Sequence, residues 1–301
     1  MLKLPGIWIR NGLLRAAICL LALVVIAIPA SAEIFFPGAR PLAMGGANVS
    51  VATDNNAIAI NPAGLNQISR YCIDLNYERR EVLLSDIGNR DKKDIKDLWN
   101  LSIVDSKTLE RLGAGLSVTS EGFPNNMFKK NQDYRIALGL GSDLFEIVRF
   151  GAAGKYMRFE KGKDSWNMDA GIMITATPWF HFGAAGYNLI TPMDRPDAMR
   201  ELTFGASLGI LEYATVAFDT VYNWEADVKK RWNFHAGAEG VIAKVVALRG
   251  GYFFDEMHNG AGYYSAGVAY TSPQGGISYT FRGHVQQAKD FNHSIQVSIQ
   301  F

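Results

Sequence analysis

The sequence predicts an all-β protein: a transmembrane antiparallel β-barrel of about 14 strands, with an N-terminal hatch or plug segment in its lumen. Three observations predict this class: an export signal, side chains that alternate between apolar and polar with period 2, and a polar face rich in glycine and charge. A composition that is 48% hydrophobic and 20% charged excludes a disordered chain. After residue 32, no apolar run approaches the ~20 residues that a membrane-spanning helix needs.

Residues 1–32 have the three parts of a cleaved signal peptide. A basic start is followed by an apolar core over residues 16–28 and by the small-residue cleavage site Ala30-Ser31-Ala32. The alternative is a retained membrane anchor, but the apolar core is short for a spanning helix. Cleavage leaves 27 basic residues against 29 acidic ones, a net charge of −2. An exported, near-neutral chain lacks the basic field that polyanions require, so we predict no nucleic-acid partner.

Residues with catalytic or metal-binding chemistry are sparse. After cleavage Cys72 is the only cysteine, and the five histidines show no metal-ligand spacing, so we predict no disulfide, metal or other cofactor. Ser207 stands in a G-x-S-x-G match. However, it lies in the middle of a clean alternation rather than at a strand-to-helix turn. We therefore predict that the protein is not an enzyme.

The alternation is clearest at the C-terminus, where every second residue from Phe291 to Phe301 is apolar or aromatic except His293. Residues 166–177, 202–210 and 215–224 repeat the pattern. A soluble periplasmic sandwich would also alternate, so the composition of the polar face decides between the two. That face carries Gly113, Gly115, Arg135, Gly139, Arg149, Gly151, Lys155, Asp169, Gly205, Gly237, Glu239, Arg249, Gly251 and Arg282. Glycine weakens a strand unless something approaches the backbone closely, so this face favours a barrel with a wet or plugged lumen.

The connections between predicted strands alternate between short and long. Short ones fall at residues 141–143, 177–178, 211–212, 243–244 and 272–275, and longer ones at 121–132, 161–165, 191–199, 225–230 and 255–260. Short periplasmic turns and longer outer loops are the usual arrangement of outer-membrane barrels. A weak strand near Trp99 brings the predicted number to fourteen, which leaves both ends of the barrel in the periplasm. Residues 91–97 mix charges and read as a solvated loop.

Residues 33–70 differ from the barrel of residues 71–301 because they lack a strand-length amphipathic run. They are rich in small and turn residues, and they include the apolar residues Phe35, Phe36 and Met44. We interpret this segment as a plug whose backbone groups find partners among polar lumen side chains. The alternative is a loose periplasmic tail, which would leave the apolar side chains in water.

Several short motifs in this segment carry a family resemblance. Gly38-Ala39-Arg40, Met44-Gly45-Gly46-Ala47, Asp54 and above all Asn61-Pro62-Ala63 resemble the N-terminal hatch of FadL/TodX-type outer-membrane transporters and of their PorV/PorQ-type relatives. The resemblance implies a fourteen-stranded barrel in the Gram-negative outer membrane, in contact with its lipopolysaccharide. The terminal Phe301 resembles the signal that the barrel-assembly machinery reads.

The resemblance also implies a function, the transport of hydrophobic small molecules or lipids, of the long-chain fatty acid or hydrocarbon type. Its ligand-binding candidates are Phe35, Phe36, Met44, Asn61, Pro62 and Ala63, and its gate candidates are Gly122, Phe123 and Pro124 near the end of the third strand. Pro124 donates no hydrogen bond, so it either breaks the strand ladder or simply begins an outer loop. The PorV/PorQ-type relatives imply the alternative function, a non-transporting barrel that assists secretion components or assembly.

Overall fold

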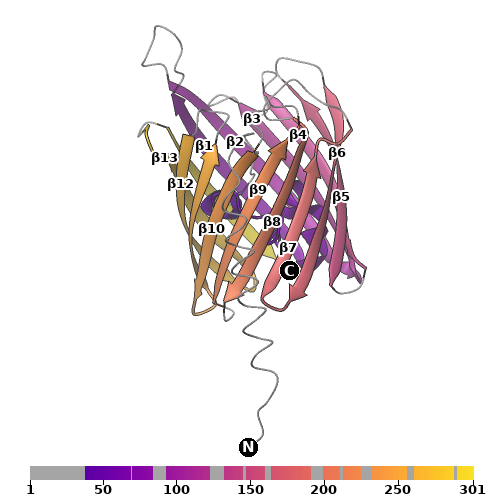
Figure 1. The fold of residues 1–301 in the computed structure, drawn as a ribbon. Coiled ribbons are helices and arrows are strands. Elements are labelled where there is room, and N and C mark those ends of the chain that lie inside the picture. Colours follow the sequence, from indigo (N-terminus) through magenta and orange to yellow (C-terminus); the bar gives the residue numbers. More distant parts are fainter. Residues whose placement is uncertain are drawn as a thin grey trace, which may run out of the picture.

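The chain forms a closed antiparallel barrel of fourteen strands (Figure 1). The computed structural model describes residues 38–68, 70–83, 93–122, 132–144, 147–159, 164–190, 199–210, 213–224, 232–255, 261–287 and 290–301. Each strand pairs with its neighbours in sequence, and β1 pairs with β14 to close the sheet. The prediction of a fourteen-stranded barrel is therefore confirmed.

The strands are β1 (Tyr71–Leu83), β2 (Lys93–Leu109), β3 (Leu112–Gly122), β4 (Asp133–Asp143), β5 (Val148–Arg158), β6 (Ser165–Thr177), β7 (Phe180–Tyr187), β8 (Glu201–Ile210), β9 (Ala214–Asn223), β10 (Trp232–Ile242), β11 (Val246–Asp255), β12 (Ala261–Ser272), β13 (Gly275–His284) and β14 (Phe291–Gln300). The backbones of Tyr71 and Phe301 exchange hydrogen bonds at the closing seam. The ladder between the first and last strands therefore reaches the final residue.

The two faces of the sheet follow the predicted alternation. Large apolar side chains such as Leu138, Ile277 and Val297 are exposed on the outward face, while the residues between them face the lumen and are mostly polar, small or charged. An outward apolar band with a polar interior is typical of barrels that cross a membrane. Among the described residues, no helix is long and apolar enough to span a bilayer.

The connections differ in length at the two ends of the barrel. At the end where β1 begins and β14 finishes, they span residues 110–111, 144–147, 178–179, 211–213, 243–245 and 273–274. At the other end they span residues 84–92, 123–132, 159–164, 188–200, 224–231, 256–260 and 285–290. This asymmetry confirms the predicted alternation and defines an outer end, the one with the longer connections.

Two predicted boundaries were wrong. Residues 93–97 are not a solvated loop but the start of β2, paired with residues 79–83 of β1. Within this stretch Asp97 has partners on β1: it pairs with Arg79 and accepts a hydrogen bond from Tyr77 at 3.0 Å. Residues 141–143 are not a turn but the end of β4. The glycine that suggested a turn, Gly141, instead makes room for the chain inside the barrel.

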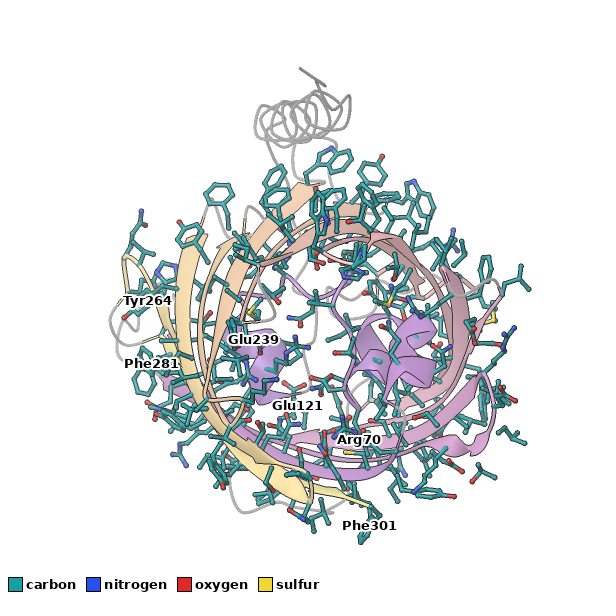
Figure 2. All side chains as sticks on the ribbon, turned by 90° about the horizontal axis from the view of Figure 1, so that it is seen from below. Arg70, Glu121, Glu239, Tyr264, Phe281 and Phe301 are labelled. Atoms are coloured by element: carbon teal, nitrogen blue, oxygen red, sulfur yellow. The ribbon has the colours of Figure 1, made fainter. Side chains whose placement is uncertain are left out.

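Residues 38–68 lie inside the barrel and are called the luminal segment below (Figure 2). The segment contains the short helices α2 (Ala39–Ala43) and α3 (Ala57–Ile60) and the 3₁₀ helix η1 (Pro62–Gln67). Helix α2 packs against β11 to β14, whereas η1 packs against β2 to β6. The segment thus contacts different parts of the wall with its two halves. Residues 33–37 and residue 69 of the predicted hatch lie outside the described residues.

Candidate functional site

A row of wall glycines receives η1. Gly113, Gly141, Gly151 and Gly171 lie next to one another on β3, β4, β5 and β6 and face the lumen. A Cβ atom at Gly151 would overlap the backbone of Pro62 and Ala63, and one at Gly113 would overlap the backbone of Leu65. Glycine is required here because backbone meets backbone directly.

A second close approach joins the other half of the luminal segment to β10 and β11. Gly237 and Gly251 are cross-strand neighbours, and a Cβ on either would overlap the backbone of Met44 or Gly45. Gly45 itself has φ +62°, and a side chain on it would meet the backbone of Tyr252. Glycine on both surfaces therefore lets segment and wall touch, and the side chain of Met44 is fully buried there.

The amide of Asn61 connects the segment to itself and to the wall. Its Nδ2 donates to the carbonyl of Val49 at 2.8 Å and to the carbonyl of Ile172 on β6 at 3.2 Å. Its Oδ1 accepts from the Ala63 N–H at 3.2 Å, which caps η1. One buried side chain therefore fixes the turn, the preceding loop and the position of both against β6.

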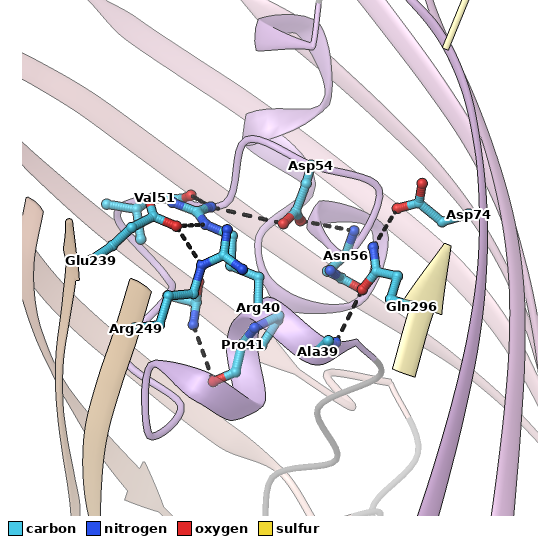
Figure 3. A network of polar contacts seen from close by, with 11 residues as sticks. Ala39, Arg40, Pro41, Val51, Asp54, Asn56, Asp74, Glu239, Arg249 and Gln296 are labelled. Carbon is cyan, nitrogen blue, oxygen red and sulfur yellow. Dashed lines mark hydrogen bonds and ion pairs between the residues drawn. The ribbon is translucent and has the colours of Figure 1, made fainter. Parts of the chain in front are cut away.

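An ion-pair network anchors helix α2 (Figure 3). The Arg40 guanidinium forms two hydrogen bonds with Glu239 of β10, at 3.0 and 3.1 Å, and a third with the Val51 carbonyl at 2.9 Å. Glu239 also accepts from Arg249 of β11. Burial lowers the pKa of Arg40, but the carboxylates of Glu239 and Asp54 outweigh this and raise the pKa above its ordinary value. Arg40 is therefore held as a cation in a bidentate pair.

Wall side chains also satisfy the backbone of the luminal segment. Asp219 of β9, only 1% exposed, accepts the N–H groups of Asn48 and Val49 at 2.6 and 2.7 Å. Ser265 and Thr280 donate to the carbonyls of Ala43 and Ala39, at 2.9 and 2.7 Å. Irregular backbone buried in a membrane protein needs such partners, and the polar lumen face supplies them.

An apolar cluster occupies part of the lumen between the segment and strands β1, β2 and β4. Its members are Ala52, Ala57, Ile58, Ile60, Leu65 and Ile68 from the segment, with Cys72, Val104 and Ala137 from the wall. It is the largest apolar cluster inside the described part of the barrel. Between segment and wall, the lumen is therefore packed with apolar side chains at this place.

A cavity of about 20 Å³ lies at the outer ends of β3, β4 and β5. It is lined by Thr119, Glu121, Asp133, Tyr134, Arg135, Met157 and Phe159. Such a volume holds about one water molecule, whereas small-molecule pockets are typically about 300–1,000 Å³. A hydrophobic solute therefore does not fit in this cavity unless the residues that line it move.

The predicted site residues have different positions. Met44, Asn61, Pro62 and Ala63 are buried where segment and wall meet, but they do not form one pocket: Met44 lies against β10 and β11, and the other three lie against β5 and β6. Gly122 is the last residue of β3 and pairs with Asp97. Phe35, Phe36, Phe123 and Pro124 lie outside the described residues.

Sequence reasoning missed two residues with clear structural roles. Asp219 on the wall binds the backbone of the segment at Asn48. Asn55 in the segment binds the backbone of the wall by donating to the Cys72 carbonyl at 3.2 Å. Asp219 interrupts a stretch of apolar and hydroxyl residues on β9, the one signal that could have identified it. Within the described ranges, no group of three or more His, Cys, Asp or Glu side chains is arranged to hold a metal ion.

The Cys72 thiol should react slowly in the folded protein. Its side chain belongs to the apolar cluster and the residue is only 5% exposed. A bulky maleimide should therefore label it much more slowly in the folded barrel than after unfolding, as measured by mass spectrometry of the intact protein. Equal rates in the two states would show that the luminal segment does not cover this part of the wall.

No protein-family model matches the sequence, and neither does any curated protein. Several solved structures do match. The CymD monoaromatic hydrocarbon channel is 14% identical, with a TM-score of 0.63 over 90% of this chain and 98% of that one. The toluene transporter TbuX of Ralstonia pickettii is 13% identical, with a TM-score of 0.63 over 89% and 99% of the two chains.

A FadL homologue from Pseudomonas aeruginosa is 10% identical, with a TM-score of 0.65 over 90% of this chain and 99% of that one. At these identities the likeness concerns the fold alone. The resemblance to FadL/TodX-type barrels predicted from the sequence motifs is thus confirmed as a similarity of fold along nearly the whole chain.

Proposed function

We propose that this protein transports small hydrophobic molecules, of the hydrocarbon or long-chain fatty acid type, across the outer membrane, with the luminal segment as its hatch. The observation that carries the proposal is the apolar cluster between segment and wall. A hydrophobic solute gains about 25 cal/mol for each Å² of apolar surface that leaves water, so this region is the favourable place for it in a polar lumen. The similar solved structures, described as a hydrocarbon channel and a toluene transporter, support the same reading.

In this proposal the hatch moves between a closed and an open position. We take the structure as the closed position, because helix α2 and η1 both pack against the wall. Asn61, Pro62 and Ala63 set the position of η1, and Phe35, Phe36 and Met44 are the further ligand-binding candidates. Gly122, Phe123 and Pro124 remain the proposed gate. Phe301 would direct the exported chain to the barrel-assembly machinery.

Replacing Asn61 with alanine should reduce hydrophobic uptake while leaving the barrel assembled. The change removes donors from the Val49 and Ile172 carbonyls and an acceptor from the Ala63 N–H, at a cost of about 1–3 kcal/mol. A hatch that is no longer held in one conformation should not present the apolar residues of the segment in the arrangement that binds the solute, so uptake falls. Uptake of toluene and of a long-chain fatty acid should be measured in cells that lack their own transporter. Small polar solutes should enter at an equal or higher rate.

The matched control is Gln67→Ala. Gln67 carries the same amide group at the last position of η1, but its contact with Met173 is a weak one, 3.6 Å from Nε2 to the sulfur. This variant should retain wild-type uptake. If the wild-type protein folds and gives no hydrophobic uptake above background, the transporter proposal fails.

One observation favours the second candidate function, a secretion or assembly partner. Strands β1 and β2 pair with each other as far as Leu83 and Lys93 (Figure 1). Their pairing with the neighbouring strands ends earlier: β1 pairs with β14 only as far as Glu81, and β2 pairs with β3 only as far as Asp97. This two-stranded ribbon therefore extends beyond its pairing with the rest of the sheet and offers a surface to a partner. Cross-linking from a cysteine introduced at Glu81 would capture that partner, and it would do so in cells that show no uptake.

A further inference from the structure

The turn between the two halves of the luminal segment reaches water inside the barrel. Thr53 is exposed and the Asp54 side chain is 27% exposed, although Val51, Ala52, Asn55 and Asn56 around them are buried. Most of the segment is packed against the wall, so exposure at this turn marks a place where neither the segment nor the wall fills the lumen. The polar side chains at the turn indicate that water occupies this space.

Charged groups border the same space. Arg40 lies 3.8 Å from Asp54 and pairs with Glu239, and the Arg40 and Glu239 side chains keep 16% and 12% of their surface exposed. In Figure 2, Glu239 and Glu121 point toward the middle of the lumen between the two halves of the segment. Glu121 is 21% exposed and pairs with Arg80 at 3.5 Å. Exposed charge therefore continues from the turn toward the outer end.

We propose that Arg40, Thr53, Asp54 and Glu239 form the constriction of a narrow water-filled path that conducts small ions and polar solutes through the barrel. We call these four residues the polar constriction. The path is separate from the apolar cluster, which lies between the segment and strands β1, β2 and β4. Charges with access to water repel a hydrophobic solute, because the solute would strip water from them, but they admit hydrated ions.

The structure explains how both routes fit in one barrel. Helix α2 is held by β10 to β14 and η1 by β2 to β6. Between them, Asp219 binds Asn48 and Val49, and Asn55 binds the carbonyls of Cys72 and Ser102. Thr53 and Asp54 keep exposed surface between these attachments, which leaves space beside the turn. Charges of both signs border the path on the same side, so it should discriminate weakly between small cations and anions.

The test uses the folded protein in planar lipid bilayers and a Thr53→Cys variant. Thr53 is exposed, so a charged methanethiosulfonate reagent should modify the new thiol from either side of the membrane and reduce the single-channel current severalfold. Ser50→Cys is the matched control: it lies three positions earlier in the same segment, it is nearly isosteric, and its site is only 2% exposed. Currents through Ser50→Cys and through the wild type, whose Cys72 is buried, should not change.

A second variant, Asp54→Asn, tests the charge at the constriction. Its amide oxygen still accepts from the Asn56 N–H, as Asp54 does at 3.1 Å, so the turn should persist. Loss of the negative charge should shift the reversal potential in a salt gradient toward anions, whereas Thr53→Ser should leave that potential at its wild-type value.

Three results would overturn the proposal: no current above that of protein-free lipid, modification of Thr53→Cys from one side only, or modification without a fall in current. Hydrophobic uptake by the Thr53→Cys variant is measured in parallel and should be unaffected by the reagent. Failure of the ionic path and failure of hydrophobic transport are therefore distinguishable.

Discussion

Replacing Gly151 with leucine should dislodge the luminal segment from a barrel that still closes. The new side chain would occupy the space of the Pro62 carbonyl and the Ala63 nitrogen, which are backbone atoms of a capped turn and cannot rotate away. Overpacking of this kind typically costs about 1–3 kcal/mol and occasionally more. The ladder that β5 forms with β4 and β6 uses only backbone groups, so the sheet itself should be retained.

The Cys72 thiol reports this change, because residues of the segment cover it. A loss of about 2 kcal/mol shifts the ratio of seated to unseated segment by up to roughly thirtyfold, and maleimide labelling of Cys72 should accelerate accordingly. Gly154→Leu is the control: it lies on the same strand, and a Cβ there would meet nothing within 4 Å. If Cys72 in Gly151→Leu is labelled as slowly as in the wild type, the close approach of η1 to Gly151 does not hold the segment in place.

Removal of the Asp219 carboxylate, on β9, should have a comparable effect on residues 48 and 49 of the luminal segment. Asp219→Ala leaves the buried N–H groups of Asn48 and Val49 without their acceptor, at a cost of about 1–3 kcal/mol for each. Hydrogen exchange of the peptide that contains residues 44–52 should accelerate by more than an order of magnitude.

Two comparisons separate this effect from general damage. Asp219→Asn keeps a neutral acceptor oxygen and should give an intermediate exchange rate. Thr220→Ala changes the next residue of β9, whose side chain leaves the lumen because strand neighbours alternate, and should exchange as the wild type does. Unchanged protection in Asp219→Ala would mean that other contacts hold residues 48 and 49.

The sequence predicted the barrel because a strand period is a local property. Alternation over β6, β8, β9 and β14 needs no tertiary information, and the alternation of connection lengths follows from it. Errors arose where local composition suggested something else. The charged residues 93–97 look solvated until Asp97 is placed beside Arg79, and Gly141 looks like a turn until Pro62 is placed against it.

The site was only partly predictable, for a different reason. The motif Asn61-Pro62-Ala63 identified a structured turn, and Glu239 and Gly151 were assigned to the lumen face by alternation. Their partners could not be assigned, because Arg40 and Glu239 are 199 residues apart, and many lumen charges offered equivalent pairings. Asp219 illustrates the limit. Its neighbours in sequence do not indicate that its carboxylate accepts hydrogen bonds from backbone N–H groups about 170 residues away.

The contacts of helix α2 have a consequence for the order of biogenesis. The Ala39 N–H donates to Gln296 across 257 residues, so a part of the chain that is translated early is bound by the strand that is translated last. Contacts of such separation form only after the entropy of a long loop has been lost. Helix α2 therefore cannot reach its final place until β12, β13 and β14 have arrived, which is also when the seam with β1 can form. The lumen is therefore filled at the same stage at which the barrel closes. A chain truncated before β14 would lack both the strand that pairs with β1 and the residue that binds helix α2.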